Sequence, residues 1–170
     1  PSILEVTGAR DVVLEFNSFS KVYNMAGWRV GMAVGGPEAI AAMARLKTNV
    51  DSGIFRPVQD AAIAALETDP GWIAQRNAAY KERRQVVTQA LERMGMRYTP
   101  SSATLYVWAA IPEGRVSADF CAALLESTGV SISPGSAFGP HGEGYVRVTL
   151  GQPVDRMEEA MARWEQWLGG

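Results

Sequence analysis

A lysine segment between two apolar runs is the feature that most constrains how this chain can fold. The segment extends from Ser18 to Gly31, and apolar residues precede it at 12–16 and follow it at 30–34. Short apolar runs bounded by glycine and polar residues are typical of buried strands. We therefore expect two strands joined by a loop that carries Lys21.

The side chains of this segment suit an aldehyde that also bears a phosphate. The amine of Lys21 can condense with a carbonyl to form a Schiff base. The hydroxyls of Ser18 and Ser20 and the guanidinium of Arg29 are groups that bind a phosphate dianion, and the glycines nearby allow a close approach of the backbone. The alternative is an exposed lysine beside a serine-rich loop.

The spacing Ser18-x-Ser20-Lys21 followed by Gly27-x-Arg29-x-Gly31 resembles the lysine segment of class I/II, fold-type I aminotransferases. The resemblance implies that Lys21 is the catalytic Schiff-base lysine. It also implies that Ser18, Ser20 and Arg29, together with Lys21, bind pyridoxal 5'-phosphate. No metal site is assigned. The resemblance covers the whole chain but less than half of that family's subunit, its C-terminal part.

A second candidate site centres on Arg147, in the run Tyr145–Leu150. Its period-two alternation places the apolar residues on one face and Arg147 on the other. An arginine in such a strand needs an anion if it is buried. The turn at 133–139 and this strand resemble the family's Pro-Gly-x-x-Phe-Gly turn and arginine strand, which implies that Arg147 binds the substrate carboxylate. The alternative is an ion pair with Glu143.

The patterning predicts an α/β chain in two parts. Strands are expected at 12–16, 30–34, 105–109, 130–133 and 145–150. Helices are expected at 38–47, 58–66, 72–94, 117–126 and 154–168, the one at 58–66 buried and the one at 117–126 capped by Ser117. The resemblance implies that residues 1–70 end the large pyridoxal-phosphate domain, that residues 71–94 are an interdomain helix, and that residues 95–170 form the small C-terminal α+β domain.

The composition of the chain indicates which binding partners and which cellular compartment to expect. The formal net charge of −2 gives no reason to expect a nucleic acid or an anionic membrane as partner. Cys121 is the only cysteine, which excludes an internal disulfide and favours a reducing compartment. It lies in an apolar pattern that predicts core packing. No apolar run reaches the length of a membrane span, so we expect a cytoplasmic protein.

The resemblance implies transamination between an L-amino acid and a 2-oxo acid by a homodimer. The segments 24–29, 49–53 and 142–147 look most like LL-diaminopimelate aminotransferases of lysine biosynthesis, with alanine and aspartate aminotransferases as alternatives. A pyridoxal-phosphate lyase, the cofactor-binding domain of a transcription regulator, and a scaffold-only half of a split fold also remain open. Because relatives supply further cofactor-binding groups from upstream, we expect little or no activity from the isolated 170-residue chain.

Overall fold

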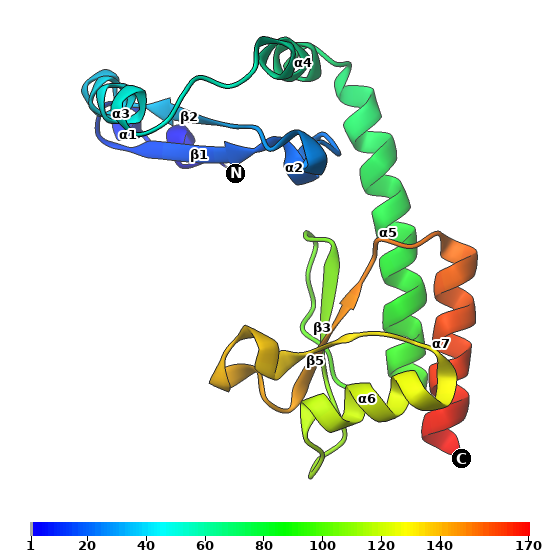
Figure 1. The fold of residues 1–170 in the computed structure, drawn as a ribbon. Helices are drawn as coiled ribbons and strands as arrows, with labels where there is room; N and C mark the ends of the chain where they lie inside the picture. Colours follow the sequence, from blue (N-terminus) through cyan, green and yellow to red (C-terminus); the bar gives the residue numbers. More distant parts are fainter. Residues whose placement is uncertain (1) are drawn as a thin grey trace. The chain divides into compact units, whose positions relative to one another are not determined.

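The computed structural model describes residues 2–170 and divides into two compact units, Pro1–Ala74 and Gln75–Gly170. Helix α5 (Pro70–Arg93) begins in the first unit and has most of its length in the second (Figure 1). The assignment of these units to a large and a small domain stays a prediction. No helix within residues 2–170 combines the length and the apolar composition that a membrane span requires.

The first unit is built on an antiparallel pair of strands. β1 (Leu14–Ser18) pairs with β2 (Gly31–Gly35), with Ser18 opposite Gly31. The connection between them contains α2 (Phe19–Val22) and the 3-10 turn η2 (Ala26–Trp28). The expectation of two strands joined by a lysine-bearing loop is confirmed, although each strand begins one or two residues later than predicted.

Helices complete the first unit. The 3-10 turn η1 (Ile3–Glu5) and α1 (Ala9–Val12) precede the strands, and α3 (Pro37–Val50) and α4 (Arg56–Leu66) follow them. Pro37 occupies the first turn of α3, where its missing N–H costs no hydrogen bond. α3 continues through residue 50, three residues beyond the range expected for this helix, and its C-cap is Asp51.

The prediction that the helix at 58–66 is buried was wrong. Only Ala62 of α4 is buried, and Ile63 and Leu66 are about half exposed. The buried core of this unit is small, with Phe19, Met25, Val30 and Ala62 as its members. Eleven of the fifteen exposed large apolar side chains lie in the first unit, so much of its apolar surface has no cover within the described residues.

The second unit contains a three-stranded antiparallel sheet in the order β3 (Tyr106–Ala110), β5 (Tyr145–Thr149) and β4 (Ser133–Pro134). β4 is only two residues long, whereas residues 130–133 were expected to form a strand. Ser133 pairs with Arg147 and Pro134 with Val146. Pro134 has no N–H to donate, which is consistent with its position on an edge strand.

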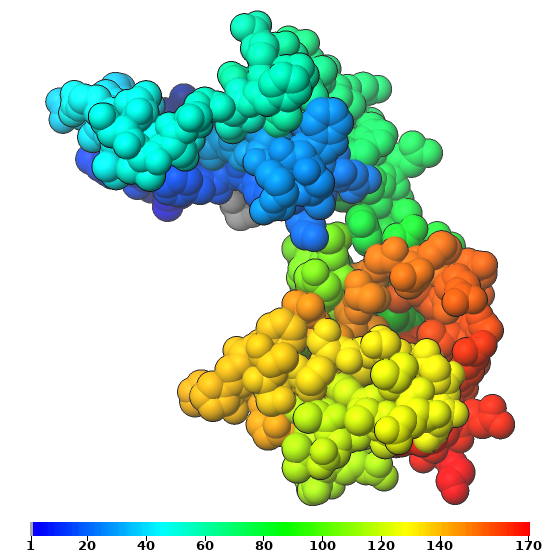
Figure 2. Space-filling view, in the orientation of Figure 1, coloured from blue at the N-terminus to red at the C-terminus, as the bar shows by residue number. Residues whose placement is uncertain are grey.

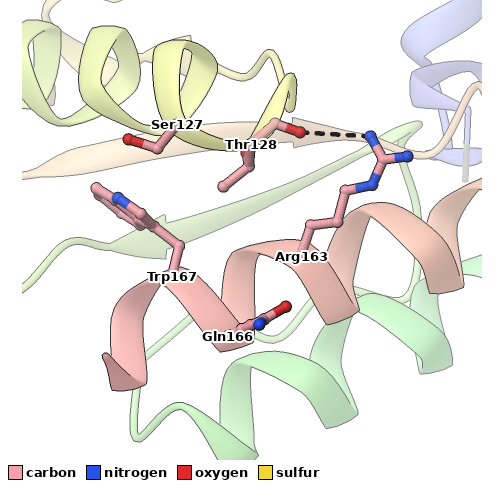
Figure 3. A pocket seen from close by; sticks show the side chains of 5 residues that line it. All are labelled: Ser127, Thr128, Arg163, Gln166 and Trp167. Atoms are coloured by element: carbon pink, nitrogen blue, oxygen red, sulfur yellow. Dashed lines mark hydrogen bonds between the residues drawn. The ribbon is translucent and has the colours of Figure 1, made fainter.

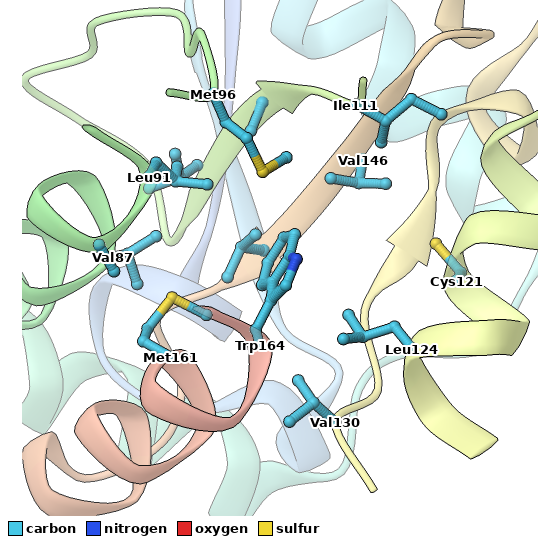
Figure 4. Close-up of a cluster of buried hydrophobic side chains, with 14 of the residues drawn as sticks. Val87, Leu91, Met96, Ile111, Cys121, Leu124, Val130, Val146, Met161 and Trp164 are labelled. Carbon is cyan, nitrogen blue, oxygen red and sulfur yellow. The ribbon is translucent and has the colours of Figure 1, made fainter. Parts of the chain in front are cut away.

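Three helices share one core with the inner face of this sheet: α5, α6 (Ser117–Thr128) and α7 (Val154–Gly169) (Figures 1 and 4). Trp164 lies fully buried at the centre of this core. The helix expected at 154–168 is confirmed as α7, and its apolar residues Met157, Met161 and Trp164 are all buried. Cys121 is buried in the same core, also as expected.

Ser117 does not cap α6 as predicted. The N-cap is Val116, which makes no side-chain cap, and Ser117 is the first helical residue and completely buried. Its partner is Glu143, 26 residues along the chain, a long-range contact that local pattern cannot reveal. Gly129 ends α6 in the left-handed conformation.

Candidate functional site

The predicted phosphate-binding serines and the lysine lie together at the end of β1. The hydroxyl of Ser18 accepts a hydrogen bond from the backbone N–H of Ser20, with an N–O distance of 3.2 Å, and so begins α2. Lys21 is in the last turn of this short helix and is exposed. Two hydroxyls and an amine are thus presented within four consecutive residues.

Arg29 stands at the other end of the same connection. It has a left-handed backbone, with φ of 51° and ψ of 45°, and its Nη1 donates to the carbonyl of Ala26 at 3.0 Å. A non-glycine residue in this region costs about 1–3 kcal/mol and persists only where the surroundings hold it. Asn24 also has a positive φ, so this short connection contains two such residues.

A small apolar cluster holds the connection in place. Phe19, Met25 and Val30 are buried, and the N–H of Phe19 donates to the carbonyl of Val30 at 3.2 Å. Above this cluster, Ser18, Lys21 and Arg29 are exposed and Ser20 is half buried. The connection therefore exposes its polar side chains to solvent, while its buried apolar side chains anchor it in a small core.

These residues fit a bound phosphate. Among residues 2–170 no carboxylate forms an ion pair with Arg29, so its charge is not neutralised from within. The hydroxyls at positions 18 and 20 add neutral donors. A positive charge and two hydroxyls on one ordered connection match the donors that a phosphate dianion requires.

Arg147 lies in the second unit, on the face of the sheet away from the helices. Its guanidinium is between two aromatic rings, with its central carbon 4.1 Å from the centroid of Tyr106 and 4.2 Å from that of Phe138. Trp108 is its cross-strand neighbour and lies edge-on to Phe138 at a centroid distance of 5.8 Å. The predicted alternation of this strand is confirmed, because Val146 and Val148 are buried.

The structure does not contain the alternative ion pair between Arg147 and Glu143. The carboxylate of Glu143 accepts hydrogen bonds from the Ser117 N–H at 2.6 Å, the Ser117 hydroxyl at 2.9 Å and the Gly144 N–H at 3.0 Å. These bonds, above all the one from the Ser117 N–H, lower the pKa of Glu143. In the part of the chain that the structure describes, no carboxylate forms an ion pair with Arg147.

The arrangement around Arg147 leaves its hydrogen-bonding edge available. Both ring centroids lie close to the central carbon of the guanidinium, and cation–π attraction favours this packing. The N–H donors lie in the plane of the group and form a fork that matches a carboxylate. The site can therefore bind one carboxylate in a defined orientation.

The candidate residues fall into two sets. Ser18, Ser20, Lys21 and Arg29 are brought together on one connection of the first unit, and Arg147 belongs to the second unit. Sequence reasoning did not identify Tyr106 as a neighbour of Arg147. Residues two apart in a strand lie on one face, so the run at 105–109 could have indicated that Tyr106 and Trp108 share a face. Their register with Arg147 depends on pairing between distant strands.

A pocket of about 380 Å³ lies elsewhere in the second unit, between the end of α6 and α7 (Figure 3). Within it, Arg163 donates to the carbonyl of Thr128 at 3.3 Å and also pairs with Glu159. Trp167 forms another part of its wall. None of the predicted site residues lines this pocket, and no cluster of three potential metal-ligating side chains occurs within residues 2–170.

Comparison with known sequences gives a consistent result. The profile of the family Aminotransferase class I and II matches residues 2–163. The LL-diaminopimelate aminotransferase of Aquifex aeolicus is 47% identical over 163 residues, which are 96% of this chain and 42% of that protein. The enzyme of the same name from Natranaerobius thermophilus is 49% identical, over 95% of this chain and 42% of that protein.

Solved structures agree. A probable N-succinyldiaminopimelate aminotransferase from Thermus thermophilus superposes with a TM-score of 0.90 at 36% identity, covering 98% of this chain and 45% of that one. Substrate-bound BacF from Bacillus superposes with a TM-score of 0.88 at 35% identity, over 98% of this chain and 43% of that one. The chain thus spans less than half the length of the relatives it matches. It has the α/β fold of the fold-type I enzymes and belongs to the class I and II aminotransferase family.

Proposed function

We propose that this chain is part of a pyridoxal-phosphate-dependent aminotransferase subunit and that it supplies the cofactor lysine and the substrate-binding arginine. The observation that carries the proposal is the arginine fork of Arg147, held between two rings and without a carboxylate partner among residues 2–170. The connection that bears Lys21, Ser18, Ser20 and Arg29 supports it with donors for an aldehyde and a phosphate.

The cofactor residues have distinct roles. Ser18, Ser20 and Arg29 bind the phosphate through hydrogen bonds, and the charge of Arg29 favours the dianion. Lys21 is the residue that would hold the aldehyde carbon, through its Nζ amine. Pyridoxal phosphate, when bound, supplies the electron sink that makes bonds at the amino-acid Cα breakable.

The substrate residues act on the amino acid. Arg147 binds the α-carboxylate with two N–H groups and so fixes the orientation of the Cα–H bond. As a free amine, Lys21 would act as general base that accepts the proton from the substrate Cα, and in its protonated form it would act as general acid. The same residues would act on the donor amino acid and on the acceptor oxo acid in turn, with the cofactor holding the amino group between the two, so we expect ping-pong kinetics.

The amino donor that we propose is LL-diaminopimelate. Two observations support this choice. The relatives that bear that name are 47–49% identical over 95–96% of this chain, and the structural neighbour from Thermus thermophilus is named for a related substrate. We further propose a homodimer in the cytoplasm. The exposed apolar surface of the first unit is consistent with weak or absent activity of the 170-residue chain alone.

Product analysis of the holoenzyme that contains this chain tests the proposal. With LL-diaminopimelate, alanine or aspartate as donor and 2-oxoglutarate as acceptor, we expect glutamate to form, fastest with LL-diaminopimelate. Ammonia released without an acceptor would instead indicate a lyase. Cofactor uptake without any product would indicate a binding domain of a regulator, and either result would overturn the proposed reaction.

A further inference from the structure

The ring centroid of Phe138 lies 4.2 Å from the central carbon of the Arg147 guanidinium, and Phe138 belongs to a pair of short turns. It ends η3 (Gly135–Phe138), a 3-10 turn followed directly by η4 (Pro140–Gly142). Together these turns form a projecting part of the second unit (Figure 2). The side chain of Phe138 is about half exposed, so its position over Arg147 depends on what fixes the turn.

A buried hydroxyl fixes this turn to helix α6. The Ser117 hydroxyl is hydrogen-bonded to the Ser136 hydroxyl at 3.0 Å and accepts from the Ser136 N–H at 3.4 Å. Ser117 is the only completely buried polar residue among those described. A buried hydroxyl without partners would be costly, so these bonds tie η3 firmly to the start of α6.

Glu143 completes this link from the other side. Its carboxylate accepts from both the N–H and the hydroxyl of Ser117, and from the Gly144 N–H just before β5. A carboxylate at the first turn of a helix also interacts favourably with the helix dipole. One side chain thus joins the start of α6, which holds η3, to the strand that carries Arg147.

We propose that Glu143, through Ser117 and Ser136, is a positioning residue that holds Phe138 over Arg147 and so orients the arginine fork. Glu143 takes no part in binding the substrate carboxylate. The positioning itself stands on these contacts alone, and only its effect on substrate rests on the proposed function. Glu143, four positions before Arg147 in the sequence, therefore affects the orientation of Arg147 indirectly, through the ring of Phe138.

The first test observes Arg147 directly. In the 170-residue chain, ring currents from Tyr106 and Phe138 should move the Arg147 Nε–H proton resonance upfield of those of exposed arginines. Phe138→Leu should return this resonance toward the exposed value. Ser136→Ala, which removes one hydroxyl from an exposed residue, and Glu143→Ala should have the same effect. Glu143→Gln retains an acceptor for the Ser117 N–H and should restore most of the upfield shift.

Glu113→Gln is the matched control, because Glu113 is an exposed glutamate on the loop before α6 with no role in this link. It should leave the Arg147 resonance unchanged. If Phe138→Leu moves the resonance while Ser136→Ala and Glu143→Ala do not, the positioning proposal is wrong.

The second test uses the holoenzyme that contains this chain. Ser136→Ala and Glu143→Ala should slow the half-reaction with the amino acid about tenfold, which is the effect of one lost hydrogen bond. The half-reaction with the corresponding decarboxylated amine should keep its rate, because that substrate has no carboxylate for Arg147 to bind. Equal slowing of both substrates would mean a merely structural role and would overturn the proposal. If Arg147→Ala slows the half-reactions with both substrates equally, the proposed carboxylate site is wrong. The NMR test still decides in that case whether Glu143 positions Phe138.

Discussion

The backbones of Gly135 and Gly142 approach so closely that a methyl group on either would lie 2.0 Å from the carbonyl oxygen of the other. These residues begin η3 and end η4, so the contact closes the two turns beside Arg147. Only glycine can occupy either position without displacing main chain.

Gly135→Ala should therefore destabilise the second unit by about 1–3 kcal/mol, the usual cost of forcing extra volume into a packed site. The new methyl group would meet rigid backbone rather than a flexible side chain. Urea unfolding measures the effect. Gly169→Ala, where a methyl group would meet nothing within 4 Å, is the control and should be close to neutral; equal effects of the two changes would contradict the packing described.

Trp164 should be the most sensitive position of the core. It is fully buried, and Trp164→Ala is expected to lower the free energy of unfolding by about 3–5 kcal/mol. Trp164→Phe should cost clearly less, because the indole N–H has no hydrogen-bond partner within residues 2–170 and its removal relieves a buried unsatisfied donor. Leu125→Ala, at an exposed site, should change stability by no more than about 0.5 kcal/mol.

Glu143 should make stability depend on pH in the acid range. Hydrogen bonds from Ser117 and Gly144 lower its pKa in the folded chain below the ordinary value of 4.5. A group with a lowered folded pKa contributes stability above its unfolded pKa and loses that contribution as the pH falls through the folded value. Wild type should thus be more stable than Glu143→Gln at pH 7, and the difference should shrink below pH 4.5.

Thermal unfolding of both proteins between neutral and acid pH measures this difference. Glu165→Gln is a useful comparison, because the hydrogen bond from Arg93 lowers the pKa of Glu165 as well. A stability difference between wild type and Glu143→Gln that stays constant throughout the acid range would show that the Glu143 carboxylate is not engaged as described.

Cys121 should be unreactive while the chain is folded. Its burial raises the pKa of the thiol to about 11, so that roughly one thiol in ten thousand is ionised at pH 7, and the thiolate is the reactive form. A thiol reagent such as DTNB should react slowly in buffer and rapidly in urea. Fast reaction of the native chain would mean that this part of the core is open.

Much of the fold could be predicted from local pattern. The strands on either side of Lys21 and the stripe of Met157, Met161 and Trp164 depend on the spacing of nearby residues, which a sequence displays directly. Gly129 as the end of α6 follows from the same local rules. The position of each of these features along the sequence is therefore determined by residues within one or two turns of it.

Long-range contacts explain where prediction failed. Ser117 has the residue type of a helix cap, but a carboxylate 26 residues away takes that place. The rings around Arg147 come from β3 and η3, and their meeting depends on strand register rather than on spacing along the chain. The burial of α4 was overestimated because apolar composition alone does not say whether a cover is present.

The measurement that most directly tests the account is to locate the lysine that binds pyridoxal phosphate in the holoenzyme containing this chain. The chain has three lysines, Lys21, Lys47 and Lys81, so borohydride reduction followed by peptide mass analysis identifies the attachment site without ambiguity. We predict that the cofactor is fixed to Lys21, that its lysine-dependent absorbance band is lost in Lys21→Ala, and that Lys47→Ala and Lys81→Ala retain it. Attachment at any other lysine, or an unchanged band in Lys21→Ala, would contradict the central claim.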